Sequence, residues 1–242
     1  MILSCLLTTI IDFVDNLGRM LVSFFFPPRC LGCGKISDLI CSSCRTQLDY
    51  VDSQVCVVCG QPAIGGFTHP RCETRYTPER TIAVFKFNSF LAKGLHTIKY
   101  RDQFVYLKPL SVLAVNWLDR QDITFSRDLL VVPVPLHWLK LWERGYNQAE
   151  LLAEQFSELL RLPLCSEVLK RVHYTKSQTQ LSFSERKKNV RGAFDATSNV
   201  QGKDILLIDD VITSGATTLS AVRALKKAHV GQVWVLALSK AA

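Results

Sequence analysis

The chain has 242 residues, of which 48% are hydrophobic and 21% are charged. These values are typical of a soluble globular protein with one medium domain and a small appendage, rather than of a disordered chain. The formal net charge is +8, and its whole excess lies in residues 81–242, because residues 1–80 carry seven basic and seven acidic side chains. A basic surface attracts phosphates on a small ligand or a nucleic acid, although a solvated face explains the charge equally well.

The first predicted element is an apolar helix over residues 1–28, which ends before a Pro-Pro pair. Two aspartates and an arginine interrupt its apolar residues, so the uninterrupted run is too short for a transmembrane span. No basic segment precedes the run and no small-residue cleavage site follows it, as a secretory signal would require. We expect the helix to pack on the rest of the protein, and the alternative is peripheral membrane contact through Phe24–Phe26.

Cysteine dominates the next zone, residues 29–76, where seven of the nine cysteines lie in close pairs. This zone has no long apolar period, so it cannot build much of a core and is expected to unfold without metal. Metal ligation requires reduced thiols, which favours a cytoplasmic location, and isolated Cys5 and Cys165 are expected in the core. The pairs "CLGC" and "CSSC" have the spacing of a closed, structural zinc site with the ligands Cys30, Cys33, Cys41 and Cys44.

From residue 81 onward, predicted strands and helices alternate. Short apolar runs predict buried strands at 81–87, 128–134, 204–209 and 232–239. Apolar residues at helical spacing predict helices within 90–100, 105–119, 147–160 and 215–228. This alternation predicts an α/β fold with a parallel sheet and crossover helices.

The segment "ILLIDDVITSGATTL" (205–219) combines a buried strand, two adjacent acids and a turn of small residues. Ligands of open parallel sheets bind beyond the carboxyl ends of the strands, and a helix that begins there offers free N–H groups to a phosphate. Asp209 and Asp210 would then accept hydrogen bonds from ribose hydroxyls or help to hold a divalent metal. The alternative is a strand that ends in two helix-capping acids.

Residues 205–217, "ILLIDDVITSGAT", resemble the 13-residue motif that binds phosphoribosyl pyrophosphate (PRPP) in type I phosphoribosyltransferases. The resemblance implies that Asp209 and Asp210 bind the ribose hydroxyls and are the catalytic acids. It also implies that PRPP binds with Mg²⁺ and that the turn holds its 5′-phosphate. The turn residues concerned are Thr213, Ser214, Gly215, Ala216 and Thr217.

The segments 131–153 and 159–194, together with the cysteine-rich zone, resemble the ComF family of competence proteins. This resemblance implies a type I phosphoribosyltransferase-like parallel sheet flanked by helices in residues 81–242. It further implies an N-terminal helix over 1–28 and a double zinc ribbon over 29–76. The second ribbon site would use Cys56, Cys59, His69 and Cys72. His69 stands where the family pattern has a cysteine, which leaves the occupancy of this site open.

Two further segments acquire roles through the same resemblance. The loop at Pro133–Leu136 is implied to hold the pyrophosphate, chiefly through Pro135 and Leu136. His137, Lys140 and Arg144 of "RGYNQ" follow this loop closely and could supply donors to the phosphates. Asn147 of that signature also suits the N-cap of the next helix. The basic segment 175–191 is either a lid over the pyrophosphate or a solvated face. The wider basic segment 170–191, with Tyr174 and Phe183, is a candidate surface for DNA. Its candidate residues are Lys176, Gln178, Gln180, Arg186, Lys187 and Lys188.

The resemblance implies a role in natural transformation, in which the protein handles incoming single-stranded DNA in the cytoplasm and binds PRPP. The alternative is an active phosphoribosyltransferase that acts on an unidentified base or nucleotide, and a third is a scaffold without the reaction. The chain ends just after the last predicted strand, where purine transferases have base-recognising residues, so enzymatic activity stays an open question. Single-stranded DNA, DNA-processing proteins and a ribose-5-phosphate ligand are the expected partners.

Overall fold

The computed structural model describes residues 27–101, 103–173 and 192–241. The helix predicted over 1–28 lies outside the described residues except for its last two positions, and the segment 175–191 lies outside them entirely. Contacts divide the chain into two compact units, Met1–Gln47 and Leu48–Ala242. The two cysteine-rich groups therefore fall in different units. Within the described ranges, no helix combines the length and the hydrophobicity needed to cross a membrane.

The described part of the first unit is a short segment of turns. Arg29 and Ile36 form an isolated antiparallel bridge, and the Gly34 amide donates a hydrogen bond of 2.9 Å to the Cys30 carbonyl inside that turn. A single helical turn, α2 (Ser42–Arg45), follows and carries Cys44. A segment of this size cannot build a core of its own, so it needs a cross-link such as a metal ion.

The second unit contains a four-stranded parallel sheet in the order β1-β6-β5-β2. Its strands consist mostly of buried apolar residues, as in parallel sheets that helices cover on both faces. This sheet confirms the predicted α/β class and all four predicted strands. They are β1 (Arg80–Lys86), β2 (Leu130–Pro133), β5 (Ile205–Ile212) and β6 (Val233–Lys240).

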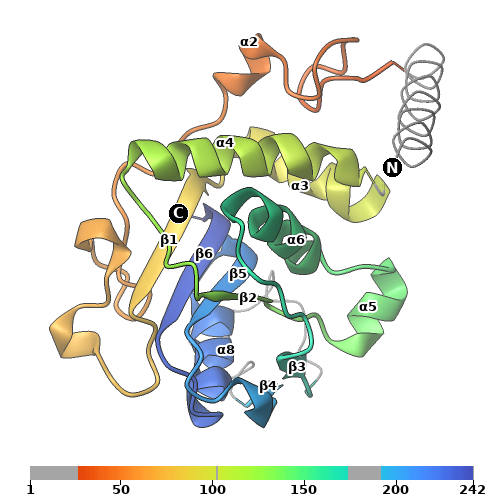
Figure 1. Cartoon of the computed structure of the whole chain (residues 1–242). Coiled ribbons are helices and arrows are strands. Elements are labelled where there is room, and N and C mark those ends of the chain that lie inside the picture. Colours follow the sequence, from red (N-terminus) through yellow and green to blue (C-terminus); the bar gives the residue numbers. More distant parts are fainter. Residues whose placement is uncertain (1–26, 102, 174–191, 242) are drawn as a thin grey trace, which may run out of the picture. The chain divides into compact units, whose positions relative to one another are not determined.

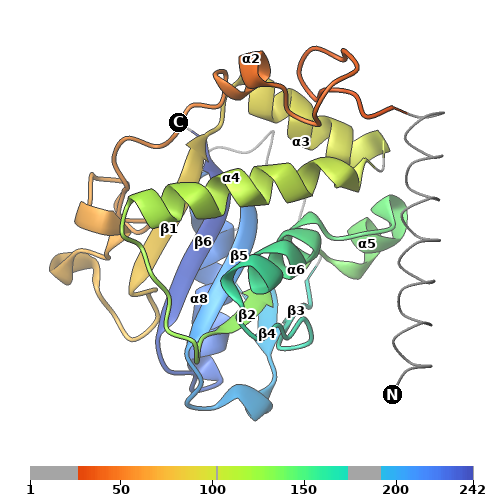
Figure 2. The same cartoon turned by 45° about the horizontal axis from the view of Figure 1, so that its top comes forward.

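Helices cover both faces of the sheet. Figures 1 and 2 show α4 and α6 over one face and α8 against the other. The apolar residues at helical spacing, such as Leu152 and Phe156 of α6 or Val222 and Leu225 of α8, are fully buried. The predicted helices are confirmed as α3 (Ser89–Arg101), α4 (Leu107–Arg120), α6 (Gln148–Leu160) and α8 (Ala216–Lys227).

Other elements were not predicted from the sequence. They are a short helix, α5 (Trp138–Arg144), and an antiparallel hairpin of β3 (Leu169–Arg171) and β4 (Phe194–Ala196). Single 3-10 turns occur at η1 (Ile64–Gly66), η2 (Pro70–Cys72), η3 (Phe104–Tyr106) and η5 (Ser198–Val200). The end predicted for the third strand, Asp209, was wrong. β5 continues to Ile212 because β6 still pairs with it there.

Residues 48–79, which carry the second cysteine group, run along the outer edge of β1. The Lys86 amide donates to the Asp49 carbonyl (2.8 Å), and the Val51 amide donates to the Val84 carbonyl (2.9 Å). Further along, Phe67 forms an antiparallel bridge with Arg80. This segment therefore covers an edge that would otherwise expose unpaired backbone groups.

The chain leaves β2 and β5 in opposite directions. After β2 it passes through α6 and pairs Leu164 with Val131, on the side of β2 away from β5. After β5 it passes through α8, on the opposite face, and returns as β6 on the other side of β5 (Figure 2). Such a reversal between neighbouring strands leaves a crevice at their carboxyl ends, where open α/β sheets bind ligands.

Candidate functional site

The crevice begins where β2 and β5 separate. Their pairing ends at Pro133 and Ile208, and β5 then continues beside β6 alone. The next two residues of β5 are the acids Asp209, which is buried, and Asp210, which is partly exposed. The Asp210 amide donates to Asp209 Oδ1 (2.9 Å), and the Val211 amide donates to Asp210 Oδ1 (2.8 Å). Neighbouring amides thus orient both carboxylates at the point where the sheet opens.

The turn after β5 leads into the N-terminus of α8. Gly215 has φ 71°, a left-handed conformation that glycine adopts without strain, and α8 begins at the next residue. The first turn of a helix has N–H groups without helical partners, and these groups favour an anion. Thr213 and Thr217 line the same cavity as the two acids. The turn therefore presents amides and hydroxyls beside the carboxylates.

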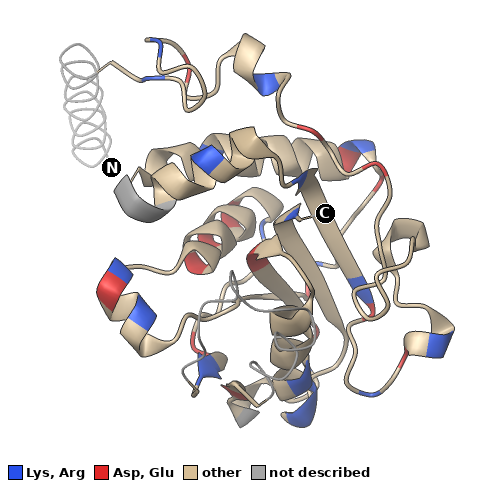
Figure 3. Ribbon diagram, turned by 180° about the vertical axis from the view of Figure 1, so that it is seen from behind, with Lys and Arg blue, Asp and Glu red and all other residues tan. Residues whose placement is uncertain are grey.

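Three cations face this end of the sheet from other elements. Lys140 and Arg144 belong to α5, and Arg171 ends β3. Burial lowers the pKa of Lys140, and the positive charges of Arg171 and Arg144 lower it further. Burial also lowers the pKa of Arg171, while the charge of Asp209 raises it. In Figure 3, α5 and β3 carry basic residues and the end of β5 is acidic.

The start of α6 adds a polar wall. Asn147 caps this helix by accepting a hydrogen bond from the Ala149 amide, which confirms its predicted capping role, and it donates to the Val134 carbonyl. Arg144 Nη1 donates to Gln148 Oε1 at 2.6 Å. Gln148 is only 2% exposed, and its Nε2 has no hydrogen-bond partner among the described residues. This buried amide is a donor that a ligand in the cavity could satisfy.

Together these elements enclose a cavity of about 500 Å³. Its acids and loop lie at the end of β5, while its cations come from α5 and β3, so one elongated ligand could meet hydroxyl-binding and anion-binding groups at once. Of the residues predicted for PRPP, the cavity is lined by Asp209, Asp210, Thr213, Gly215, Thr217, Pro135, Leu136 and Arg144.

The two remaining turn residues lie elsewhere. Ser214 lines a second, smaller cavity, and Ala216 is buried at the start of α8. Sequence reasoning did not include Arg171 and Gln148 among the site residues, and it named Lys140 only as a possible donor. The basic character of 170–191 was the signal for Arg171, and "RGYNQ" contains Gln148. The candidates from Lys176 to Lys188 lie outside the described residues.

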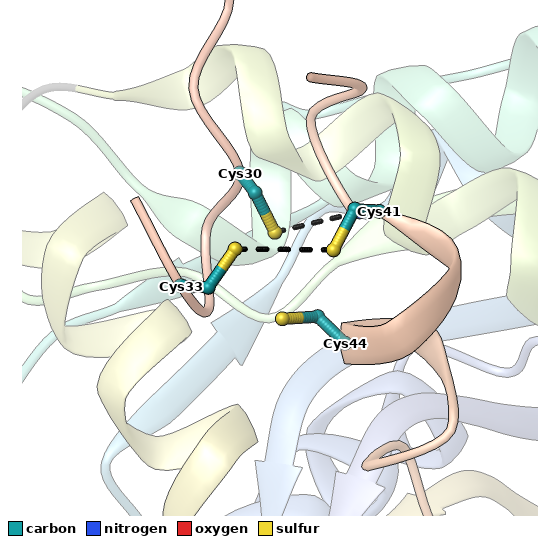
Figure 4. A group of neighbouring side chains, drawn as sticks. All are labelled: Cys30, Cys33, Cys41 and Cys44. Atoms are coloured by element: carbon teal, nitrogen blue, oxygen red, sulfur yellow. Dashed lines mark hydrogen bonds between the residues drawn. The ribbon is translucent and has the colours of Figure 1, made fainter. Parts of the chain in front are cut away.

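The first cysteine group brings four sulfur atoms together (Figure 4). The Sγ atoms of Cys33 and Cys41 are 3.9 Å apart, and a zinc tetrahedron with bonds of about 2.3 Å has edges of about 3.8 Å. Burial raises the pKa of Cys30, but backbone amides that donate to its sulfur bring that pKa down to about 6. Burial and the neighbouring sulfurs raise the pKa of Cys44 to about 12. A divalent cation would stabilise all four groups as thiolates, so this set fits structural zinc.

The second group, Cys56, Cys59, His69 and Cys72, also converges, with all ligand atoms within 4.8 Å of one another. Cys59 Sγ lies 3.4 Å from His69 Nδ1, and His69 Nε2 lies 3.0 Å from the Pro62 carbonyl oxygen. A backbone carbonyl on the second ring nitrogen is the usual way to orient a metal-binding histidine. Histidine therefore fits the position at which the family pattern has a cysteine.

Comparisons with known proteins agree with this arrangement. A double zinc ribbon domain matches residues 21–73, and a phosphoribosyl transferase domain matches residues 144–239. The DNA utilization protein YhgH of Escherichia coli is 31% identical over 207 residues, which cover 81% of this chain and 89% of that protein. The chain belongs to the ComF family. Its parallel sheet is accordingly a phosphoribosyltransferase-type sheet, and its double zinc ribbon supports structural zinc.

Other relatives carry related names. Competence protein F of Haemophilus influenzae is 29% identical over 90% of this chain and 99% of its own length. Competence protein ComFC of Bacillus subtilis is 28% identical over 79% of each chain. Among solved structures, a hypoxanthine-guanine phosphoribosyltransferase from Schistosoma mansoni in complex with IMP matches with a TM-score of 0.28 and 13% identity. This match covers 56% of this chain and 63% of that one. A likeness this low says nothing about the ligand of the present site.

Proposed function

We propose that the protein binds PRPP with Mg²⁺ in this cavity and acts in the cytoplasm on single-stranded DNA that enters during natural transformation. One observation carries the ligand: a single cavity joins the paired acids, the glycine turn at a helix N-terminus and three cations from separate elements. The acids suit ribose hydroxyls, the turn suits the 5′-phosphate, and the cations suit the pyrophosphate. Mg²⁺ would neutralise the pyrophosphate beside the carboxylates and would be held partly by the ligand itself.

The biological role follows from the relatives, which are named for competence and DNA utilization. These names concern the handling of DNA rather than transfer to a particular base, so we treat PRPP as a bound ligand. The zinc sites support the cytoplasmic location, since a reducing compartment keeps their thiols available to the metal. DNA-processing proteins are the expected partners.

Isothermal titration of PRPP with Mg²⁺ tests the ligand. We expect Asp209→Asn and Asp210→Asn together to weaken binding at least about 100-fold, because each variant loses hydrogen bonds to a charged acceptor. Asp119→Asn, on the exposed end of α4, is the matched control and should bind like the wild type. Equal binding by the diacid variant and the control, or no binding by the wild type, would refute the proposal.

The surface of α5 favours contact with single-stranded DNA. Trp138 and Trp142 are 66% and 81% exposed, and they lie four residues apart on the same helix as Lys140 and Arg144. Residues at this spacing are neighbours on a helix surface. Exposed aromatic rings form the usual platform for unpaired bases, since every base can stack on a ring.

Fluorescence anisotropy with a labelled oligonucleotide tests this platform. We expect Trp138→Ala together with Trp142→Ala to weaken binding at least about tenfold, and we expect wild-type affinity to fall as salt rises. Ile64→Ala, which removes another highly exposed apolar side chain, serves as the control. If the double tryptophan variant binds DNA as tightly as the wild type, α5 is excluded as the contact surface.

A further inference from the structure

The phosphate turn, residues 213–217 between β5 and α8, packs directly against the second cysteine group. Val57 lies inside the turn "CVVC" and is buried. A Cβ atom added to Gly215 would lie only 2.6 Å from Val57 Cγ2 and 3.1 Å from the Val57 carbonyl oxygen. Real side chains do not approach so closely, so glycine at position 215 allows the turn to rest on this valine. The ribbon thus touches the turn that would hold the ligand's phosphate.

The position of Val57 depends on the geometry of the metal site. The Cys56 amide donates to the Gln61 carbonyl (2.9 Å), and the Gly60 amide donates to the Cys56 carbonyl (2.8 Å). These hydrogen bonds form a tight turn whose two cysteines point their sulfurs at the same ligand group. A metal bound by this group would fix the cysteines on either side of the Val57–Val58 pair, and with them the position of Val57.

The ribbon is also anchored to the sheet. The buried side chain of Gln54 donates to the Ala83 carbonyl and accepts from the Ala83 amide, both at 2.9 Å, so it occupies the place of a strand neighbour of β1. Behind the phosphate turn, a cavity of about 270 Å³ is lined by ribbon residues and by Thr213–Gly215. In this cavity Ser214 Oγ and Thr81 Oγ1 are buried and have no hydrogen-bond partner in the part of the chain that the structure describes. The valine contact therefore supports the turn mainly by packing.

We propose that the metal of the second cysteine group is a support for the phosphate turn, and that Val57 is the positioning residue through which it acts. Coordination holds Val57 against Gly215, and Gly215 holds the turn amides at the N-terminus of α8. Loss of the metal or of the valine side chain leaves the turn free to move, so a phosphate must order it on binding. The inference rests on the proposed function only where it concerns the ligand.

Val57→Ala tests this support without removing a metal ligand. Val58→Ala is the matched control, because it changes the neighbouring valine of the same turn, whereas the nearest contacts of Gly215 all come from Val57. Both variants should retain the zinc content of the wild type. We expect Val57→Ala to raise amide hydrogen exchange across residues 213–217 about tenfold, and Val58→Ala to leave it unchanged. If Val57→Ala exchanges like Val58→Ala, the proposal is wrong.

Ribose 5-phosphate is the probe for the ligand, since it carries the phosphate without the pyrophosphate. We expect its affinity to fall at least about fivefold in Val57→Ala and to stay unchanged in Val58→Ala. Wild-type protein that binds neither this probe nor PRPP would refute the proposed function. The exchange measurement would still decide on the support, so the two failures are distinguishable.

A double-mutant cycle tests the contact itself. Gly215→Ala should weaken ribose 5-phosphate binding because its methyl group collides with Val57 and because an L side chain is strained at φ 71°. Adding Val57→Ala removes the closer of the colliding atoms, so the double variant should bind no more weakly than Gly215→Ala alone. If the affinity loss of the double variant equals the product of the two single losses, the two residues act independently and the proposal is overturned.

Discussion

Each cysteine group consists of two ligand pairs with two residues between the ligands of a pair, but the two groups stabilise different parts of the protein. The first closes a short segment of turns around Cys30–Cys44 in its own unit. The second belongs to the unit with the parallel sheet, where Gln54 binds β1 and Val57 contacts the phosphate turn. Ligand spacing thus identifies a metal site, whereas the residues between and beside the ligands determine which part of the protein depends on it.

The largest contrast is expected from removing one ligand of each group. Cys72→Ser should lower both the melting temperature of the sheet unit and the affinity for ribose 5-phosphate, because structural zinc contributes about 10 kcal/mol or more to folding. Cys44→Ser should remove the first metal and leave that affinity unchanged. Zinc content, thermal unfolding and titration measure the three quantities. Equal losses of affinity in both variants would remove the distinction between the groups.

A smaller effect is expected from the Gln54 anchor. Gln54→Ala leaves the Ala83 amide and carbonyl without their partner, at a cost of about 2–4 kcal/mol for two buried groups. Denaturant unfolding should show this loss. Gln61→Ala changes an exposed glutamine in the same ribbon and should cost almost nothing. A stable Gln54→Ala variant would mean that the ribbon does not depend on this anchor.

The ion pair between Lys226 and Glu79 should contribute less. Its atoms are 2.6 Å apart and mostly shielded, and Glu79 also accepts a hydrogen bond from the Val233 amide. Glu79→Gln keeps the shape of the side chain and should cost about 1–2 kcal/mol of unfolding free energy. This variant tests whether the connection from the ribbon into β1 is tied to α8 and β6. An unchanged unfolding curve would show that it is not.

The smallest effect is expected from the ion pair between Lys86 and Asp52, which also joins the ribbon segment to β1. Both side chains are well exposed, at 49% and 82%, so water screens their attraction. Asp52→Asn should leave the melting temperature unchanged within about 1 °C. A clear drop would show that surface charge, rather than burial, attaches the ribbon.

Periodicity and apolar runs were sufficient to predict the sheet and its main helices, since each is long enough to show a pattern. α5 escaped prediction because seven residues show barely two turns of periodicity. The continuation of β5 past Asp209 also escaped, because acids disfavour strands and only pairing with Ser239 and Lys240 of β6 extends it.

The candidate site was predictable where one segment carries it, as with Asp209, Asp210 and the turn that follows them. It was not predictable where the fold brings distant segments together. Arg171 reaches the cavity through an unpredicted hairpin, and Val57 meets Gly215 across more than 150 positions of the chain. Such contacts leave no local signal, since neither residue type is unusual in its own segment.

The contact between Val57 and Gly215 also bears on how freely the parts of this protein could be exchanged. A ribbon from another protein, grafted in front of this sheet, would need a side chain of matching shape at the position of Val57. A phosphate turn with a larger residue in place of Gly215 would in turn need a different ribbon. Although the sequence suggests two successive domains, the second cysteine group and the sheet cannot be exchanged separately in a chimaeric protein.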